Sequence, residues 1–234
     1  MAIRIISYDR AVFADRREAG CLLAEQLGEF SHKNAVVLGI PRGGIIIARE
    51  VASEIGASLD ILLARKLQAP ETPELAIGAI AENGTVYLND TMIDELNIPK
   101  AYIDEEIMHQ KAELRARQKV FRPVRPKENL SGRPVIVTDD GAATGATLEA
   151  ALRSCRKERP SQLVCAFPSG SDEAVARLAH ECDLLVALSV PPFFSSVSLA
   201  YRMFDQVTDE QVLSILRKEA EHENSKTGSV TRRS

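Results

Sequence analysis

The chain is predicted to fold as an α/β protein, with three layers and a mostly parallel twisted sheet flanked by helices. Three observations predict this class. Short apolar runs alternate with longer segments of helical periodicity, as expected for strands joined by crossover helices. The run at 35–40 is wholly apolar, which is typical of a strand covered on both faces. A length of 234 residues, 45% of them hydrophobic, suits one α/β domain with a sizeable core.

The elements of the first half follow from apolar spacing and from glycine. A helix is expected over 15–30, followed by the strand at 35–40. Gly43 and Gly44 then open a helix that Gly56 ends, and a second buried strand follows at 59–64. Two further runs, 76–81 and 85–88, predict a hairpin that turns at Asn83-Gly84.

A long charged helix is predicted over 100–120. Its acidic residues come first and its basic residues follow, which suits the helix dipole. An acidic metal site or a binding face would be two functional interpretations. We favour a solvated outer helix or a dimer arm, because charged runs on helices usually face water. A homodimer built partly on this helix is therefore plausible.

The second half repeats the alternation of strand and helix. Strands are expected at 134–138, 163–167 and 184–188, with helices at 145–157 and 172–180. An irregular segment begins at Pro191-Pro192, and a closing helix over 208–219 is capped by Thr208 with Gln211. We therefore expect one domain over 1–220, with a helical insertion at about 90–122. The polar tail at 221–234 is expected to be disordered.

Composition narrows the possible partners and the location. The formal net charge is −4, so the chain lacks the basic stripe that nucleic-acid binding usually needs. No apolar run approaches the roughly 20 residues of a membrane span, and the first residues lack the apolar core of a signal peptide. A cytoplasmic protein that binds neither nucleic acid nor membrane is the simplest expectation.

The segment 135–147 carries the clearest chemical signal. An apolar strand ends in Asp139 and Asp140, and glycines, alanines and threonines follow up to Thr147. Small residues let backbone N–H groups approach an anion, and the next helix adds the positive end of its dipole. The two acids would repel a phosphate, so they suit neighbouring hydroxyl groups or a magnesium-bound group. The pattern therefore predicts a site for a phosphorylated ribose, rather than a simple helix cap.

This segment closely resembles the phosphoribosyl-pyrophosphate (PRPP) binding motif of type I phosphoribosyltransferases. The resemblance extends from 13–16 to 204–207, and to a bacterial branch of the family with no assigned acceptor. The segment 40–44 is similar to the family's first pyrophosphate loop. Arg65-Lys66 resembles the basic pair that meets pyrophosphate in several members. Residues 71–80 would then hold the mobile loop that closes over the site.

The resemblance implies the fold of this family and Mg²⁺-dependent transfer of a 5-phosphoribosyl group from PRPP to a small acceptor, such as a nucleobase, with release of pyrophosphate. It assigns catalysis to Asp139, Asp140, Arg65 and Lys66, and contact with the metal to both aspartates, indirectly through Mg-PRPP. The residues expected to bind PRPP are Arg42, Gly43, Gly44, Asp139, Asp140, Gly141, Ala142, Ala143, Thr144, Gly145, Ala146 and Thr147.

The acceptor end is less specific. In this family a hood follows the last core strand, here residues 190–205. Phe193 or Phe194 could stack on an aromatic base, but packing of the hood itself explains them equally well. Two other functions stay open: a protein of this fold that senses PRPP or a nucleotide without turnover, and a hydrolase or phosphorylase of a phosphoribosylated compound.

Overall fold

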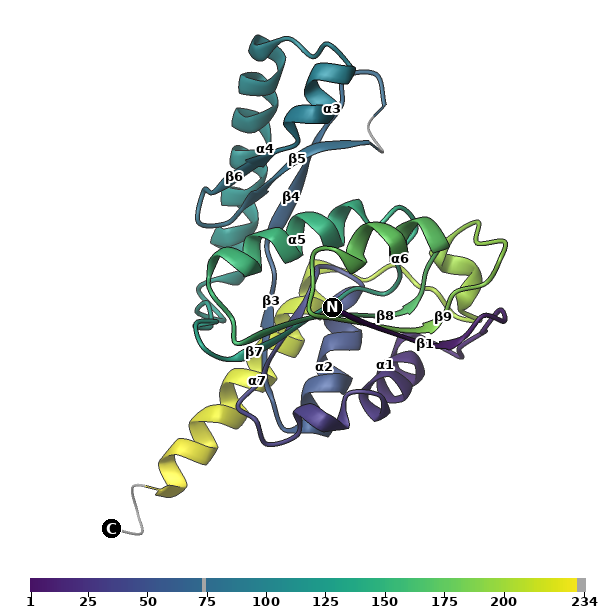
Figure 1. Ribbon diagram of the computed structural model, residues 1–234. Helices are drawn as coiled ribbons and strands as arrows, with labels where there is room; N and C mark the ends of the chain where they lie inside the picture. The colour runs from purple at the N-terminus through teal and green to yellow at the C-terminus, as the bar shows by residue number, and fades with distance from the viewer. Residues whose placement is uncertain (73–74, 231–234) are drawn as a thin grey trace.

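The computed structural model of the chain describes residues 1–72 and 75–230 (Figure 1). A six-stranded parallel sheet forms its centre, in the order β1-β9-β8-β7-β2-β3. These strands are β1 (Ala2–Ser7), β2 (Val36–Gly39), β3 (Ser58–Ile61), β7 (Pro134–Thr138), β8 (Gln162–Ser169) and β9 (Leu184–Ser189). The crossover helices are α1 (Arg16–Glu25), α2 (Gly44–Ile55), α5 (Ala146–Lys157) and α6 (Asp172–Ala179). The predicted fold class is confirmed.

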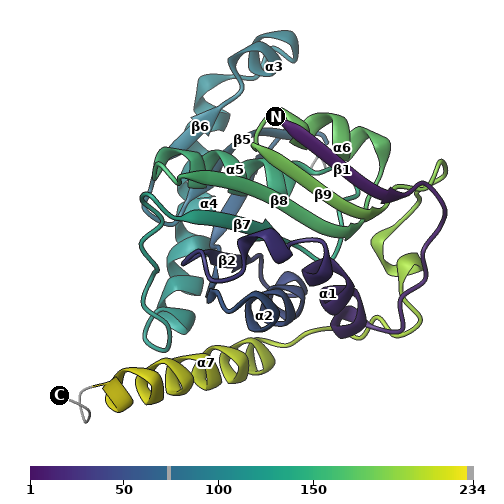
Figure 2. The same cartoon turned by 60° about the horizontal axis from the view of Figure 1, so that its bottom comes forward.

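Helices cover both faces of the central sheet. Side chains alternate along each strand, so that Val37 and Ile136 belong to the core under α1 and α2, while Val36 and Val135 belong to the core under α5 and α6. The closing helix α7 (Asp209–Val230) adds to the first of these cores and extends away from the sheet (Figure 2). Burial on both faces explains why these strands are rich in apolar residues.

A second, smaller sheet stands apart from the first. It consists of the antiparallel strands β4 (Ala64–Gln68), β5 (Ala76–Ala81) and β6 (Val86–Leu88), and the predicted hairpin at Asn83-Gly84 is confirmed. Helices α3 (Asp90–Glu95) and α4 (Lys100–Phe121) accompany it, and we call residues 64–121 the arm (Figure 1). Helix α5 contacts both the central sheet and the arm strands β4 and β5.

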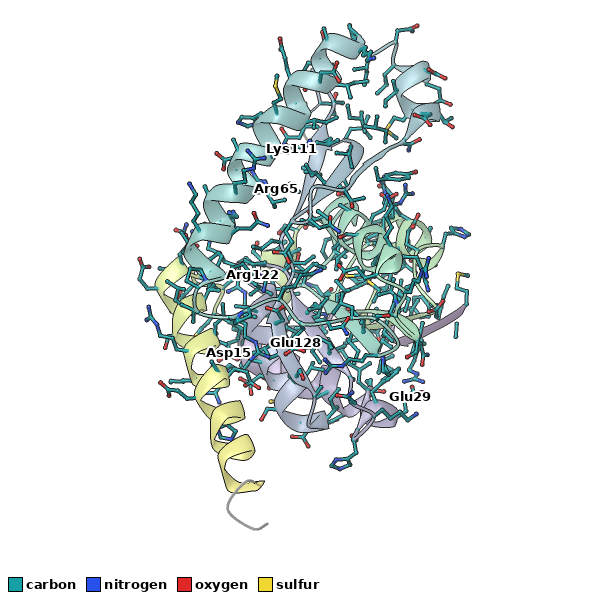
Figure 3. The ribbon with its side chains drawn as sticks, turned by 90° about the vertical axis from the view of Figure 1, so that its left-hand side faces the viewer. Asp15, Glu29, Arg65, Lys111, Arg122 and Glu128 are labelled. Carbon is teal, nitrogen blue, oxygen red and sulfur yellow. The ribbon has the colours of Figure 1, made fainter. Side chains whose placement is uncertain are left out.

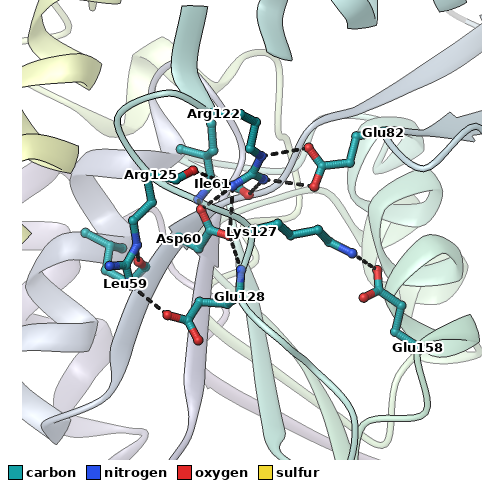
Figure 4. A network of polar contacts seen from close by, with 9 residues as sticks. All are labelled: Leu59, Asp60, Ile61, Glu82, Arg122, Arg125, Lys127, Glu128 and Glu158. Atoms are coloured by element: carbon teal, nitrogen blue, oxygen red, sulfur yellow. Dashed lines mark hydrogen bonds and ion pairs between the residues drawn. The ribbon is translucent and has the colours of Figure 1, made fainter. Parts of the chain in front are cut away.

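A buried network of charges joins the end of α4 to the central sheet (Figure 4). Arg122 donates to both oxygens of Asp60 on β3, at 2.8 and 3.1 Å, and to Glu82. Arg125 donates to the Leu59 carbonyl, and the Glu128 N–H donates to Asp60. Asp60 is buried, and burial raises its pKa although Arg122 opposes the shift. The network therefore fixes where the arm leaves the core.

Three parts of the chain differ from the prediction. Strand β1 is not predicted, because an edge strand with exposed Ile3 and Ile6 lacks the continuous burial that reveals the others. The run predicted as one strand over 59–64 divides: β3 ends at Ile61 and β4 begins at Ala64. Residues 76–80 of the predicted mobile loop over 71–80 belong to β5, which pairs with β4. Residues 73–74 of that loop lie outside the described residues.

The C-terminal helix is also longer than expected. The predicted cap is present, since the Thr208 hydroxyl accepts from the Gln211 N–H and the Gln211 amide accepts from the Thr208 N–H. The helix continues to Val230, past its predicted end at Glu219. No proline interrupts 220–230, and glycine first occurs at Gly228, so the sequence allows the helix to continue past Glu219. Residues 221–230 of the predicted tail are therefore described as part of this helix, and 231–234 lie outside the described residues.

Candidate functional site

A pocket of about 140 Å³ lies where the carboxyl ends of β2 and β3 meet the arm. Its walls come from four parts of the chain: the ends of β2 and β3, strand β4, the first turn of α5 and one face of α4. The lining residues are Ile40, Pro41, Leu62, Leu63, Ala64, Arg65, Lys66, Gln68, Gln110, Leu114, Arg117 and Thr147. We call it the cationic pocket, because Arg65, Lys66 and Arg117 line it. Open α/β sheets place ligands at this edge.

The loop between β7 and α5, residues 139–145, presents unused backbone donors. The described residues supply no acceptor for the amide N–H groups of Ala143, Thr144 and Gly145. Gly145 has a φ of 74°, which a residue with a side chain would adopt only under strain, and it leads directly into α5. Successive free N–H groups at a helix N-terminus form a cradle for an anion.

The neighbouring β8–α6 connection holds this loop in place. The Ala142 N–H donates to the Ser169 carbonyl, and the Ser171 N–H donates back to Ala142. The Ser171 hydroxyl donates to the Ala143 carbonyl at 2.6 Å. These bonds satisfy the carbonyl groups of Ala142 and Ala143, and they leave the N–H groups of 143–145 without a partner among the described residues. The hood also contacts the loop, since Val197 packs against Gly141.

The two aspartates after β7 have different environments. Asp139 accepts from the Asp140 N–H at 2.9 Å, and Asp140 accepts from Arg16 Nε at 2.8 Å. Burial raises the pKa of Asp139 well above its usual range, and the Asp140 carboxylate adds to the shift. Burial raises the pKa of Asp140 too, although Arg16 opposes it. Two adjacent carboxyl groups with one cation can accept hydrogen bonds from hydroxyl groups and can share a proton.

Arg16 links the N-terminal segment, the aspartates and the hood. Its Nη1 donates to the Asp205 carbonyl at 2.8 Å, and its guanidinium lies 3.8 Å from the centre of the Phe204 ring. The Tyr201 hydroxyl donates to the Asp140 backbone carbonyl at 2.5 Å, so the hood holds the backbone of that residue while Arg16 holds its carboxylate. Arg16 is a site residue that the sequence does not predict. In the sequence it stands in the charged run 15–18, and such runs are common on surfaces.

The predicted pyrophosphate loop packs directly on the aspartates. Ideal Cβ atoms at Gly43 and Gly44 would lie 1.9 Å from Asp140 Oδ2 and 2.8 Å from the Asp139 Cα, respectively. Glycine is therefore required here for close approach of two loops. Arg42 precedes them, and the acid that approaches it, Asp209, lies 4.0 Å away. The loop and the aspartates thus form one surface at the ends of β2 and β7.

Arg65 and Lys66 lie on β4 rather than at the end of a central strand, and both line the cationic pocket. Arg65 lies beside α4 (Figure 3), where its Nε donates to Gln110 Oε1 at 2.9 Å. The prediction of a wholly solvated outer helix is therefore wrong for one face of α4. Gln110, Leu114 and Arg117 face the pocket, and their spacing of four and three residues was the signal available in the sequence.

Phe193 and Phe194 lie apart from these groups. They line a separate pocket of about 40 Å³ with Arg10, Pro191 and Ser169, and Phe193 is 96% exposed. Neither phenylalanine lines the cationic pocket. Tyr201 and Phe204 of the hood are engaged with each other and with Arg16. The structure therefore does not bring the predicted acceptor residues together with the predicted pyrophosphate residues.

Two other predictions bear on cofactors and membranes. The described residues contain no cluster of three or more His, Cys, Asp or Glu side chains able to hold a metal ion. Among the same residues, every helix is too short or too polar to cross a bilayer.

Residues 16–202 match the family described as "Phosphoribosyl transferase domain". "Putative phosphoribosyl transferase Rv0571c" of Mycobacterium tuberculosis (strain H37Rv) is 42% identical over 205 residues, which cover 88% of this chain and 46% of that protein. The chain therefore spans about half the length of this curated relative. The crystal structure of TT1426 from Thermus thermophilus has a TM-score of 0.82 and 44% identity, and the match covers 88% of this chain and 98% of that one.

Proposed function

This chain belongs to the phosphoribosyl transferase domain family, and we propose that it transfers the 5-phosphoribosyl group of PRPP to a small acceptor, releasing pyrophosphate. One observation carries the proposal. The free N–H groups of 143–145 and the cationic pocket lie at the same edge of the sheet, with Asp139 and Asp140 at the strand end next to both. A ribose with a monophosphate at one end and a diphosphate at the other suits two such anion sites.

Different groups of the site would bind different parts of PRPP. The loop 139–145 would hold the 5-phosphate, so that binding energy far from the reacting carbon orients the sugar. Asp139 and Asp140 would accept hydrogen bonds from the ribose hydroxyls and favour positive charge as it develops on the ring. The bond from the anomeric carbon to pyrophosphate would break, and a bond from that carbon to the acceptor would form.

The leaving pyrophosphate would take the electron pair of the broken bond. Arg42, Arg65 and Lys66 would then stabilise its added charge, with the N–H groups of Gly43 and Gly44 close by. Closure of the site would exclude water, which would otherwise hydrolyse PRPP.

Mg²⁺ fits this scheme as a partner of the ligand. The described residues contain no cluster of three ligating side chains, and Asp139 and Asp140 would approach the ion through the ribose or through water. An ion bound to the diphosphate would neutralise charge on the leaving group. The predicted dependence on Mg²⁺ thus follows from the chemistry of the substrate.

A sensor without turnover is the second candidate, and a specific observation favours it. The hood aromatics Tyr201 and Phe204 are packed on Arg16, while Phe193 points to solvent, so no described aromatic stands over the cationic pocket. A protein that binds PRPP without an acceptor would need nothing more than the two anion sites.

One experiment separates these functions. The protein is incubated with Mg²⁺ and PRPP against a panel of nucleobases and amines, and pyrophosphate and product masses are measured. Release that depends on an acceptor supports transfer, release without acceptor supports hydrolysis, and saturable binding without release supports the sensor. The double variant Asp139→Asn and Asp140→Asn should lose activity, while Glu173→Gln, at an exposed acid on α6, should not. Unchanged PRPP affinity and rate in the double variant would contradict the site.

A further inference from the structure

Arg117 of the arm is a cation held at an inward position. Helix α4 buries Ile103, Gln110, Leu114 and Phe121 along one stripe, and Arg117 falls on that stripe three residues after Leu114. It is half-buried and lines the cationic pocket. An inward stripe normally carries apolar residues, so an arginine there needs an explanation.

The three arginines around this pocket, Arg42, Arg65 and Arg117, have few acids close to them. Arg42 and Arg65 each have an acid only at 4.0 Å, Asp209 and Glu113 respectively. Arg117 makes no ion pair within 4.0 Å among the residues described. Burial lowers its pKa, and repulsion from Arg65 and Arg42 adds to that effect although Asp209 and Glu113 oppose it. Like charges gathered around a pocket are stabilised when a multivalent anion enters between them.

The arm orients the Arg65 side chain and fixes where Arg117 stands on α4. Gln110 is buried, accepts from Arg65 Nε at 2.9 Å and donates to Glu106 at 3.0 Å. Glu106 in turn accepts from the Gln68 N–H of β4 at 3.0 Å. Because the network at Arg122 anchors the end of the same helix, Arg117 is held close to its anchored end. The pocket wall on this side is therefore preorganised.

We infer that Arg117 is a specificity residue of this site: it contacts the diphosphate end of the ligand and selects PRPP over sugar phosphates that lack a diphosphate. The inference rests on the proposed function and adds a residue from the helical insertion to it. Arg117 lines the pocket together with Pro41 of the pyrophosphate loop, whereas the loop 139–145 binds the other end of the ligand. Loss of Arg117 therefore weakens binding of the diphosphate end of the ligand and leaves binding of the 5-phosphate unchanged.

The test compares three probes on the full chain by calorimetry with Mg²⁺: PRPP, inorganic pyrophosphate and ribose 5-phosphate. Arg117→Met removes the charge and keeps an unbranched apolar side chain. We expect roughly 10- to 100-fold weaker binding of PRPP and pyrophosphate, as for a lost charged hydrogen bond, and a change below about twofold for ribose 5-phosphate. Arg115→Met is the matched control, because Arg115 is exposed on the same helix, and all three affinities should stay unchanged.

The outcomes are distinguishable. If the wild-type chain prefers PRPP to ribose 5-phosphate and Arg117→Met keeps that preference, the role of Arg117 is refuted and the proposed function stands. Equal weakening of all three probes would also refute it, since that indicates a general loss of the site. If the wild-type chain shows no preference for PRPP, both the inference and the proposed function fail. Circular dichroism and thermal unfolding of Arg117→Met should show an intact fold, because the change removes repulsion between cations.

Discussion

The replacement Arg16→Met tests whether one buried cation sustains the ionised aspartate of the site. The variant loses the 2.8 Å bond to Asp140, the 2.8 Å bond to the Asp205 carbonyl and the contact with the Phe204 ring. The side chains of Arg16 and Asp140 are only 10% and 17% exposed, so solvent screens the pair weakly. Removing one partner of a buried pair costs about 3–5 kcal/mol, because the other charge stays buried.

We therefore expect the free energy of unfolding to fall by about 3–5 kcal/mol at pH 7, out of a typical total of about 5–15 kcal/mol. Urea unfolding followed by circular dichroism measures the change. The matched control is Arg17→Met on the same helix. Arg17 is 70% exposed and lies 3.4 Å from Glu50, so its loss should cost less than about 1 kcal/mol.

The cost should also depend on pH, with a definite sign. Without Arg16, the pKa of Asp140 rises further above its ordinary value, since burial is no longer opposed. The folded variant then binds a proton that the unfolded chain lacks, so its stability relative to wild type increases as the pH falls. The difference between the two proteins should narrow from pH 7 towards the ordinary carboxyl value of 3.8. The reasoning would be refuted if Arg16→Met lowered the free energy of unfolding no more than Arg17→Met does. It would also be refuted if the loss caused by Arg16→Met were the same at acidic and neutral pH.

Three further predictions concern the anchor of the arm and the site itself. Arg122→Met should lower the free energy of unfolding by about 3–5 kcal/mol, because it leaves two buried carboxylates without their cation. Lys127→Met removes the more exposed ion pair with Glu158 and should lower the free energy of unfolding by less than about 1 kcal/mol. Equal losses for the two variants in urea unfolding would contradict the role of the Arg122 network. Asp139→Asn should be more stable than wild type at neutral pH, because the raised pKa of Asp139 means that its charge opposes folding. This gain in the free energy of unfolding should shrink as the pH falls, by up to about 1.4 kcal/mol per pH unit, until the pH reaches the ordinary carboxyl pKa. Thermal unfolding at several pH values measures the gain, and a gain that does not change with pH would contradict the prediction. Gly43→Ala should weaken PRPP binding more than about tenfold in calorimetry, because its Cβ would displace the nearby carboxylate. Gly28→Ala, where a Cβ meets open space, should bind PRPP as wild type does, and equal affinities of the two variants would argue against close packing at Gly43.

The central fold can be predicted because its information is local. Buried parallel strands produce apolar runs, so β2 and β7 are recognisable in the sequence. The loop 139–145 is recognisable because two acids and two glycines follow β7 directly. Arg65 and Lys66 do line a pocket, but they do not lie at the end of a central strand as the sequence suggests. Their strand belongs to a second sheet, and only the folded chain shows that this sheet faces the end of β2.

The contributions of Arg16 and Arg117 cannot be predicted in the same way. Each is a single charged residue whose neighbours are far away in sequence: Asp140 lies 124 residues after Arg16. The sequence of helix α4 predicts a solvated helix because most of its residues are polar or charged, and its inward stripe is interrupted by Gln110 and Arg117. Polar residues on the inward face of a helix weaken the apolar periodicity from which burial is predicted, and these are the positions that line the pocket here.

Helix α5 has a consequence for the length of the ligand. Its first turn follows the phosphate loop, and along its side it contacts β4, the strand that carries Arg65. This one helix would therefore set the spacing between the two proposed anion sites. Ligands with the same charges on a longer or shorter sugar should fit only one site at a time. The protein would then distinguish molecules by the distance between their phosphates, independently of how strongly each phosphate is bound.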